Sequence, residues 1–318
     1  MNNRINSFST LSFERGWSDW IKLVAAIMVA LSHYSTVIVF NNHWSSNPII
    51  SLLAQGGYIG VAIFFFFSGY GLMESESKQH LTITQFLKKR LVKVYLPVLL
   101  VSFLWIPIYY YVNHEDISIT FWGVSYDIFW GFRDCVLWFV KILFFLYILF
   151  YFFSLGFNAG YKILSNILLL CGLVLVLYIG KYYNFPIISI PYFVIGVYAS
   201  LYKQVRVCKI PFTLFVLFIF GIVCALLYIL NPMPEFAHAT LNTIMLFIMV
   251  LMFKYINKSP KISLSGIWLT SIYTIYIVHF KVLDFMVWQW GYISIFSWLV
   301  TTFVITLIVS YLRKLLKI

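Results

Sequence analysis

Two polar residues stand out in the first apolar run of the chain, residues 19–40. Lys22 lies near the start of this run and His33 lies deep inside it. At about 100° per residue, they fall about 20° beyond three full turns, on one face of a helix, and about 16 Å apart along its axis. An imidazole can take a proton near neutral pH, as a general base does. A buried ammonium can stabilise negative charge, so Lys22 and His33 are candidate catalytic residues.

Both residues have a simpler alternative. If the run crosses a membrane, the Lys22 side chain can lie along the apolar surface so that its ammonium reaches the inner lipid headgroups. It can also pair with Asp19 one turn earlier. His33 is too deep for that, but it can be a neutral, hydrogen-bonded packing residue. A polar residue inside a membrane is costly and usually serves function, which favours the catalytic interpretation of His33.

Two later runs contain further buried polar residues. His279 lies in "SIYTIYIVHFK", with Lys281 and Asp284 close behind it. It is a second candidate for acid–base chemistry, with packing as the alternative. Lys141 lies in "LWFVKILFF" and is either a substrate contact or the partner of Asp134, two turns earlier.

Two stretches near the second and third runs suggest substrate binding. Ser68 and Gly69 follow a run of four phenylalanines and predict a bend or a polar notch. The stretch "FLKKRLVKVYLP" then places Lys88, Lys89 and Arg90 together. These basic residues either contact the phosphates of a soluble ligand or touch anionic lipid and set topology.

An acidic and aromatic segment, residues 113–135, is the longest expected outer segment. Trp122, Tyr126 and Trp130 recur every four residues in it, as on one face of a short helix. The rings form either an aromatic belt at the membrane interface or a platform on which the apolar face of a sugar stacks.

Composition places the chain among polytopic membrane proteins. Of its 318 residues, 62% are hydrophobic and 10% are charged, against about 25% charged in soluble domains. The net charge of +12 is interpreted as membrane topology, not as a nucleic-acid interface. The first run is too long for a cleavable signal peptide. The four cysteines show no C-x-x-C pair, so no metal site is expected.

Apolar runs of crossing length recur along the whole chain. We expect an all-α fold of about ten membrane-spanning helices in one domain, residues 1–318, with residues 1–19 as a cytoplasmic N-terminal segment and no soluble domain. Most Lys and Arg residues fall in alternate connections, which predicts that both termini are cytoplasmic. The runs cover residues 20–40, 50–73, 91–112, 136–154, 163–180, 186–202, 211–230, 238–256, 266–288 and 292–312.

The chain resembles the acyltransferase 3 family of bacterial inner-membrane acyltransferases. The resemblance lies in "SDWIKLVAAIMVALSH", "GYIGVAIFFFFSGYGL", "FLKKRLVKVYLP" and "SIYTIYIVHF". Lys22 occupies the position of the family's usual arginine and keeps its charge without its bidentate fork, and His33 occupies the family's histidine position. Ser68 and Gly69 match the family's Ser-Gly, and Arg90 matches its basic motif.

The resemblance implies transfer of an acyl group, most often acetyl from acetyl-CoA, to a hydroxyl of a surface or exported polysaccharide. His33 would be the general base, and Lys22 would stabilise charge near the phosphates or pantetheine of coenzyme A. Acyl-CoA would be a donor substrate, with no cofactor held permanently. The expected partners are the lipid bilayer, acyl-CoA, the carbohydrate acceptor and possible polysaccharide-assembly proteins, but not nucleic acid.

Two other functions remain compatible with the residues. Buried lysines and histidines also occur in proton-coupled transporters and flippases, here for a lipid-linked glycan. Such proteins often show internal repeats and paired interrupted helices, which this sequence does not display. A non-catalytic membrane component of a polysaccharide-assembly complex is the third alternative.

Overall fold

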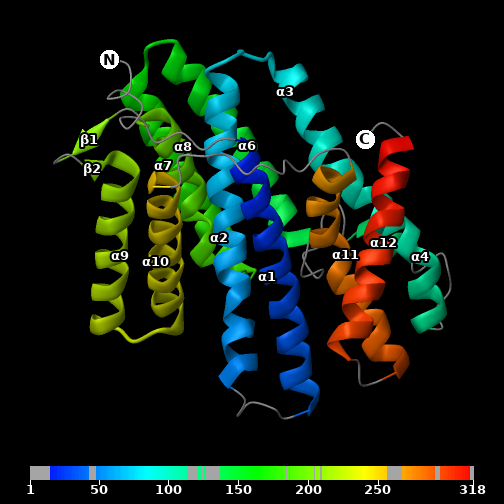
Figure 1. Cartoon of the computed structure of the whole chain (residues 1–318). Coiled ribbons are helices and arrows are strands. Elements are labelled where there is room, and N and C mark those ends of the chain that lie inside the picture. The colour runs from blue at the N-terminus through cyan, green and yellow to red at the C-terminus, as the bar shows by residue number, and fades with distance from the viewer. Residues whose placement is uncertain are drawn as a thin grey trace, which may run out of the picture. The chain divides into compact units, whose positions relative to one another are not determined.

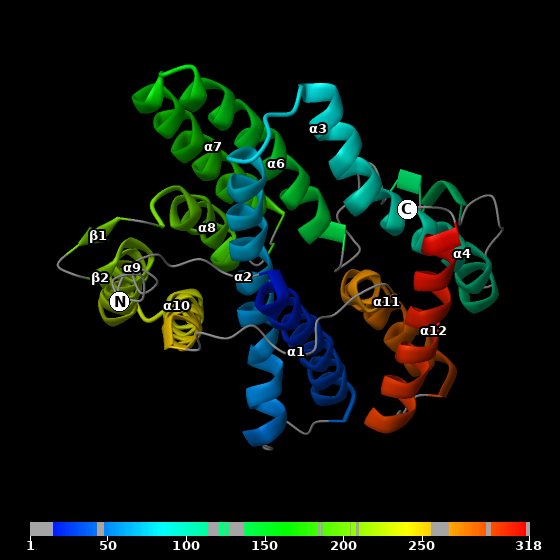
Figure 2. The same cartoon turned by 45° about the horizontal axis from the view of Figure 1, so that its top comes forward.

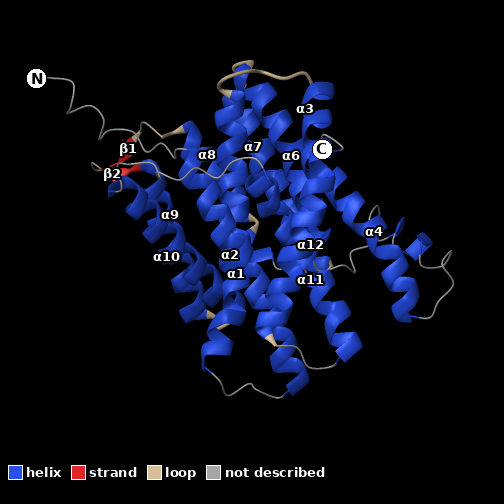
Figure 3. Ribbon diagram, turned by 45° about the vertical axis from the view of Figure 1, so that its right-hand side comes forward, coloured by secondary structure: helices blue, strands red, loops and turns tan. Residues whose placement is uncertain are grey.

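The computed structural model of the chain is almost entirely helical (Figure 3). It describes residues 15–42, 48–113, 121–123, 125–126, 137–183, 185, 187–203, 205–207, 210–255, 267–290 and 294–315. The α-helices are α1 (Arg15–Asn42), α2 (Pro48–Glu76), α3 (Ile83–Arg90), α4 (Leu96–Asn113), α6 (Leu137–Asn158), α7 (Lys162–Tyr182), α8 (Pro191–Leu201), α9 (Phe212–Leu230), α10 (Pro234–Tyr255), α11 (Ile267–Trp290) and α12 (Ile295–Leu315).

Shorter elements also occur among the described residues. A π-helix, η2 (Leu91–Tyr95), joins α3 to α4, and a 3-10 turn, η3 (Ile187–Ser189), precedes α8. The strands β1 (Arg206–Val207) and β2 (Ile210–Pro211) form an antiparallel hairpin before α9.

The expectation of an all-α polytopic membrane protein is confirmed. Within the described residues, eight helices are long and apolar enough to cross a membrane. The sixth predicted span is shorter, since it corresponds to the apolar helical stretch Ile187–Leu201. The ninth predicted span corresponds to α11, a helix of 24 residues. The orientation of the termini stays a prediction.

The entry into the third span shows how local sequence shapes the backbone. Thr82 caps α3 in a capping box with Gln85, which satisfies backbone donors at the helix start. In a regular α-helix the ring of Pro97 would clash with the carbonyl of Lys93. The turn before it instead widens into η2, and the Leu96 N–H bonds to the Leu91 carbonyl.

The chain forms two compact units, and α1, α2 and α6 each contribute residues to both. Unit 1 consists of residues 1–28, 55–80 and 153–264. In it, α9 and α10 lie side by side as an antiparallel pair joined by a short turn (Figures 1 and 2). An ion pair of 2.7 Å joins Lys203 to Glu74, whose carboxylate also accepts a hydrogen bond from the Ser200 hydroxyl.

Unit 2 consists of residues 29–54, 81–152 and 265–318. Here α11 packs against α12 and against α4, and α11 and α12 form a helical hairpin (Figure 1). Trp298 of α12 is fully buried, and its indole stacks on Tyr34 of α1 with the ring centroids 4.9 Å apart. This packing joins the second half of α1 to α12 in one core.

Candidate active site

A pair of histidines lies in the core of unit 2. Nδ1 of His33 on α1 is 2.9 Å from Nε2 of His279 on α11. The two rings are stacked, with their centroids 5.0 Å apart and an interplanar angle of 21°. The structure therefore unites two of the predicted catalytic residues, which are 246 positions apart in the chain.

The hydrogen bonds of His279 determine which nitrogens of a neutral pair carry protons. Nδ1 of His279 lies 3.0 Å from the Ile275 carbonyl oxygen, which can only accept, so this nitrogen carries the hydrogen. Nε2 of a neutral His279 is then an acceptor, and Nδ1 of His33 must donate to it. The basic lone pair of His33 is thereby on Nε2, as a general base requires.

The surrounding side chains hold both rings in place. His279 is fully buried, and its backbone carbonyl accepts a hydrogen bond of 3.2 Å from the Trp298 indole N–H. Phe280 meets the His33 ring edge to face at 5.2 Å. His33 itself is only half-buried. The arrangement fixes the orientation of His33 without enclosing the residue completely.

Lys22 belongs to unit 1, whereas His33 belongs to unit 2. The Lys22 ammonium lies 5.8 Å from the centroid of the Phe67 ring on α2. This distance allows a cation–π attraction, and Lys22 is half-buried. Phe67 was not identified from sequence, because it is one of four successive phenylalanines.

Gly69 has a close-packing role in the structure. A Cβ added there would lie 2.0 Å from the Phe193 carbonyl oxygen of α8, and a Cβ added at Gly196 of α8 would lie 2.0 Å from the Phe66 carbonyl oxygen of α2. The two glycines therefore let the backbones of α2 and α8 touch, as small residues do in membrane helices. The neighbouring Ser68 is half-buried.

The basic cluster divides into exposed and enclosed members. Lys88 and Lys89 are exposed on α3, but Arg90 lies over two aromatic rings, 5.4 Å from the Phe86 centroid and 5.5 Å from the Tyr147 centroid. Its Nε atom is buried and has no hydrogen-bond partner among the described residues. The Arg90 guanidinium is thus a cation held in one orientation, and its Nε–H has no described acceptor.

Sequence reasoning missed a buried arginine in the last turn of α12. Arg313 is 5% exposed, donates to the Thr274 hydroxyl at 2.8 Å and lies 6.0 Å from the Tyr273 ring centroid. The Tyr273 hydroxyl in turn donates to the Val94 carbonyl of η2 at 2.9 Å. The position of Arg313 in the last turn of an apolar run is typical of a basic residue that sets membrane topology. No sequence signal therefore indicated its contact with Thr274.

The structure gives the burial of most of the remaining predicted residues. Lys141 is 5% exposed in α6, inside unit 2. Trp122 and Tyr126 are 70% and 57% exposed, and Trp130 lies outside the described residues. Lys281, two positions after His279, is buried, whereas Asp284 is exposed.

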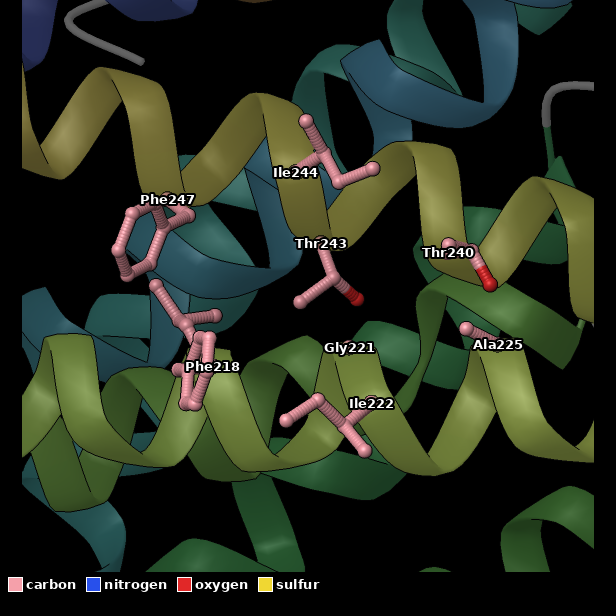
Figure 4. Close-up of a pocket in the computed structure, with 9 residues that line it drawn as sticks. Phe218, Gly221, Ile222, Ala225, Thr240, Thr243, Ile244 and Phe247 are labelled. Carbon is pink, nitrogen blue, oxygen red and sulfur yellow. The ribbon is translucent and has the colours of Figure 1, made fainter.

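A pocket of about 240 Å³ lies between α9 and α10 (Figure 4). Its two hydroxyls, on Thr240 and Thr243, donate to the backbone carbonyls of Phe236 and Ala239. It therefore offers an apolar surface without acid–base groups. Its other lining residues include Phe218, Gly221, Ala225 and Phe247.

Apolar helices of crossing length, with a histidine pair enclosed among them, define a multi-pass membrane protein with side chains suited to proton transfer. Residues 15–313 match the family model described as an acyltransferase domain, and the chain belongs to this family of acyltransferases. The resemblance identified from sequence is thereby confirmed, and the protein is a membrane acyltransferase. No curated protein and no solved structure gives a match.

Proposed function

We propose that the protein transfers an acyl group, most often acetyl, from acyl-CoA to a hydroxyl of a surface or exported polysaccharide at the bacterial inner membrane. The observation that carries this proposal is the hydrogen-bonded series from Ile275 through His279 to His33. It provides a base of defined tautomer inside a membrane acyltransferase. An acceptor hydroxyl needs such a base, because it is a weak nucleophile until its proton is taken.

The proposed step transfers the acyl group directly. His33 Nε2 takes the proton of the acceptor hydroxyl while the hydroxyl oxygen attacks the thioester carbonyl carbon. The new C–O bond forms, the carbon–sulfur bond breaks, and the coenzyme A thiolate leaves. The protonated His33 then returns its proton to this thiolate, so the products are an ester and free coenzyme A.

His279 supports this step without touching the substrate. While His33 is protonated, its Nδ1–H is a charged donor, and hydrogen bonds from charged donors are stronger than neutral ones. The 2.9 Å contact with His279 therefore stabilises His33 most in the state that follows proton removal. In this proposal His33 is the catalytic residue and His279 is a positioning residue.

Arg90 and Lys22 would serve the anionic donor. The Arg90 guanidinium is held over Phe86 and Tyr147 with a buried donor atom without a described partner. Phosphate oxygens fit such a donor, since arginine bonds them in a planar fork. Lys22 would stabilise charge on the donor, while the exposed Lys88 and Lys89 would add a longer-range attraction.

The test uses the purified protein with acetyl-CoA labelled in its acetyl group and cell-surface glycan as acceptor. Label in the glycan that is released as acetate by mild base supports the proposal. Mass spectrometry of glycans from a deletion strain identifies the lost ester independently. His33→Gln should abolish transfer, whereas His80→Gln, which changes an exposed histidine paired with Glu76, is the matched control. Glycan transport without acyl transfer would instead support the transporter alternative.

A further inference from the structure

A second polar group lies inside unit 1, on α2 and α10. The rings of Tyr58 on α2 and His238 on α10 are stacked, with centroids 4.4 Å apart and an interplanar angle of 23°. Gln55 lies one turn before Tyr58, and Asn242 lies one turn after His238. Residues three or four apart share a helix face, so Gln55, Tyr58, His238 and Asn242 form one group, here called the polar stripe.

Unsatisfied polar atoms distinguish the polar stripe from ordinary packing. The Asn242 side chain is 0% exposed, and neither its Nδ2 nor its Oδ1 atom has a hydrogen-bond partner among the described residues. The Oε1 atom of Gln55 is likewise buried without a described partner. The adjacent Thr243 hydroxyl, by contrast, bonds both to the Ala239 carbonyl and to Tyr192.

A membrane-embedded amide without partners is expensive. No bulk water reaches the hydrocarbon region to satisfy it, and a buried polar group left unpaired costs more than an apolar side chain of the same shape. Each such group therefore calls for a partner supplied from outside the chain. Asn242 needs both a donor and an acceptor, and Gln55 needs a donor.

Hydroxyl groups meet these needs, because each O–H can donate and also accept. None of the four side chains is a lysine or an arginine, in contrast to the surroundings of Arg90, so the polar stripe suits a neutral ligand and not an anion. Glu235, which interacts electrostatically with His238, adds one more acceptor at the start of α10. We propose that the polar stripe binds neutral hydroxyl groups of the sugar acceptor.

This proposal rests on the proposed function, and Asn242→Leu is the sharpest variant to test it. Leucine has a similar size, so the substitution removes two unsatisfied atoms without opening a cavity. The melting temperature of the purified protein should rise or stay unchanged. The ester content of the glycan should nevertheless fall at least tenfold, when expression is lowered until ester content is proportional to enzyme level. Coenzyme A release from acetyl-CoA in water, without sugar, should be unchanged.

Two further variants keep the test decisive. Thr240→Val removes a hydroxyl of α10 that already donates to the Phe236 carbonyl, outside the polar stripe, and should leave ester content normal. His238→Phe preserves a ring for Tyr58 but removes the nitrogens, so it should also lower ester content. This variant provides the test if Asn242→Leu fails to fold.

Normal ester content in a folded Asn242→Leu or His238→Phe protein would overturn the proposal. The proposal would also be overturned if either variant lost ester content and sugar-independent coenzyme A release to the same extent. The defect would then concern donor binding or the chemical step. Absence of any ester with the unaltered protein would instead reject the proposed function itself, a result separate from both.

Discussion

Nδ1 of His33 and Nε2 of His279 lie 2.9 Å apart, although 246 positions separate the residues in the chain. His33 comes from the first helix and His279 from the next-to-last. Their contact, together with the bond from His279 to the Ile275 carbonyl, gives His33 a defined tautomer with its basic lone pair on Nε2. The proposed chemistry depends on this tautomer.

Replacing His279 should slow the chemical step without weakening donor binding. His279→Leu removes the acceptor of the His33 Nδ1–H, whereas His279→Gln keeps an amide oxygen that can accept it. We expect kcat to fall about 10- to 100-fold for Leu and less for Gln, below the about 10²–10⁴-fold of a general base itself. Steady-state kinetics should show an unchanged KM for acetyl-CoA. A rise in the KM for acetyl-CoA as large as the expected fall in kcat would indicate a binding role instead.

The charge of Lys22 should matter more than its shape. Lys22→Arg keeps the cation over Phe67 and should retain activity, whereas Lys22→Met keeps the length but loses the charge. We expect transfer by Lys22→Met to fall at least about tenfold, in line with the loss of a charged hydrogen bond of about 1.5–3 kcal/mol. Ester content at matched membrane levels measures it. Full activity of Lys22→Met would remove Lys22 from the mechanism.

Gly69 and Gly71 offer a matched pair of packing variants. A Cβ at Gly69 would meet the backbone of α8, but a Cβ at Gly71 would meet nothing within 4 Å. Gly69→Ala should destabilise the protein by about 1–3 kcal/mol, as overpacking does, whereas Gly71→Ala should be neutral or slightly stabilising, since alanine favours helices. Thermal unfolding in detergent measures both. Similar melting temperatures for the two variants would contradict the close contact of α2 and α8.

Arg90 should determine the affinity for the donor. Arg90→Met removes the enclosed cation, and a lost charged hydrogen bond is worth about 1.5–3 kcal/mol, so KM for acetyl-CoA should rise at least about tenfold. Lys89→Met, which changes an exposed residue on the same helix, should have a small effect. Should both variants raise KM equally, the cluster acts through its total charge and not through a built site.

The predicted orientation can be tested with exposed serines between helices. Ser77 follows α2 and is expected on the cytoplasmic side, whereas Ser294 precedes α12 and is expected outside; both are exposed. In a protein whose four native cysteines are replaced by serine, a membrane-impermeant thiol reagent should label Ser294→Cys in intact cells and Ser77→Cys only after lysis. Labelling of both from the outside would refute the topology.

Much of the fold was predictable from sequence. Apolar runs of crossing length are a local property, and each of the ten predicted spans coincides with a helix or helical stretch. The widening of the helix before Pro97 also has a local cause, because proline clashes with the carbonyl four residues earlier.

The partners of the chemical groups, by contrast, depended on tertiary structure. Sequence alone indicated that His33 and His279 are polar residues in lipid, and that cost made them candidates. Helical periodicity assigns a residue to a face of its own helix, but not to a neighbour on a helix hundreds of residues away. The His33–His279 bond, the contact of Gly69 with α8 and the burial of Arg313 all arise from packing among distant helices. The same packing left Asn242 without a described partner, because an unpaired amide becomes visible only when its surroundings are known.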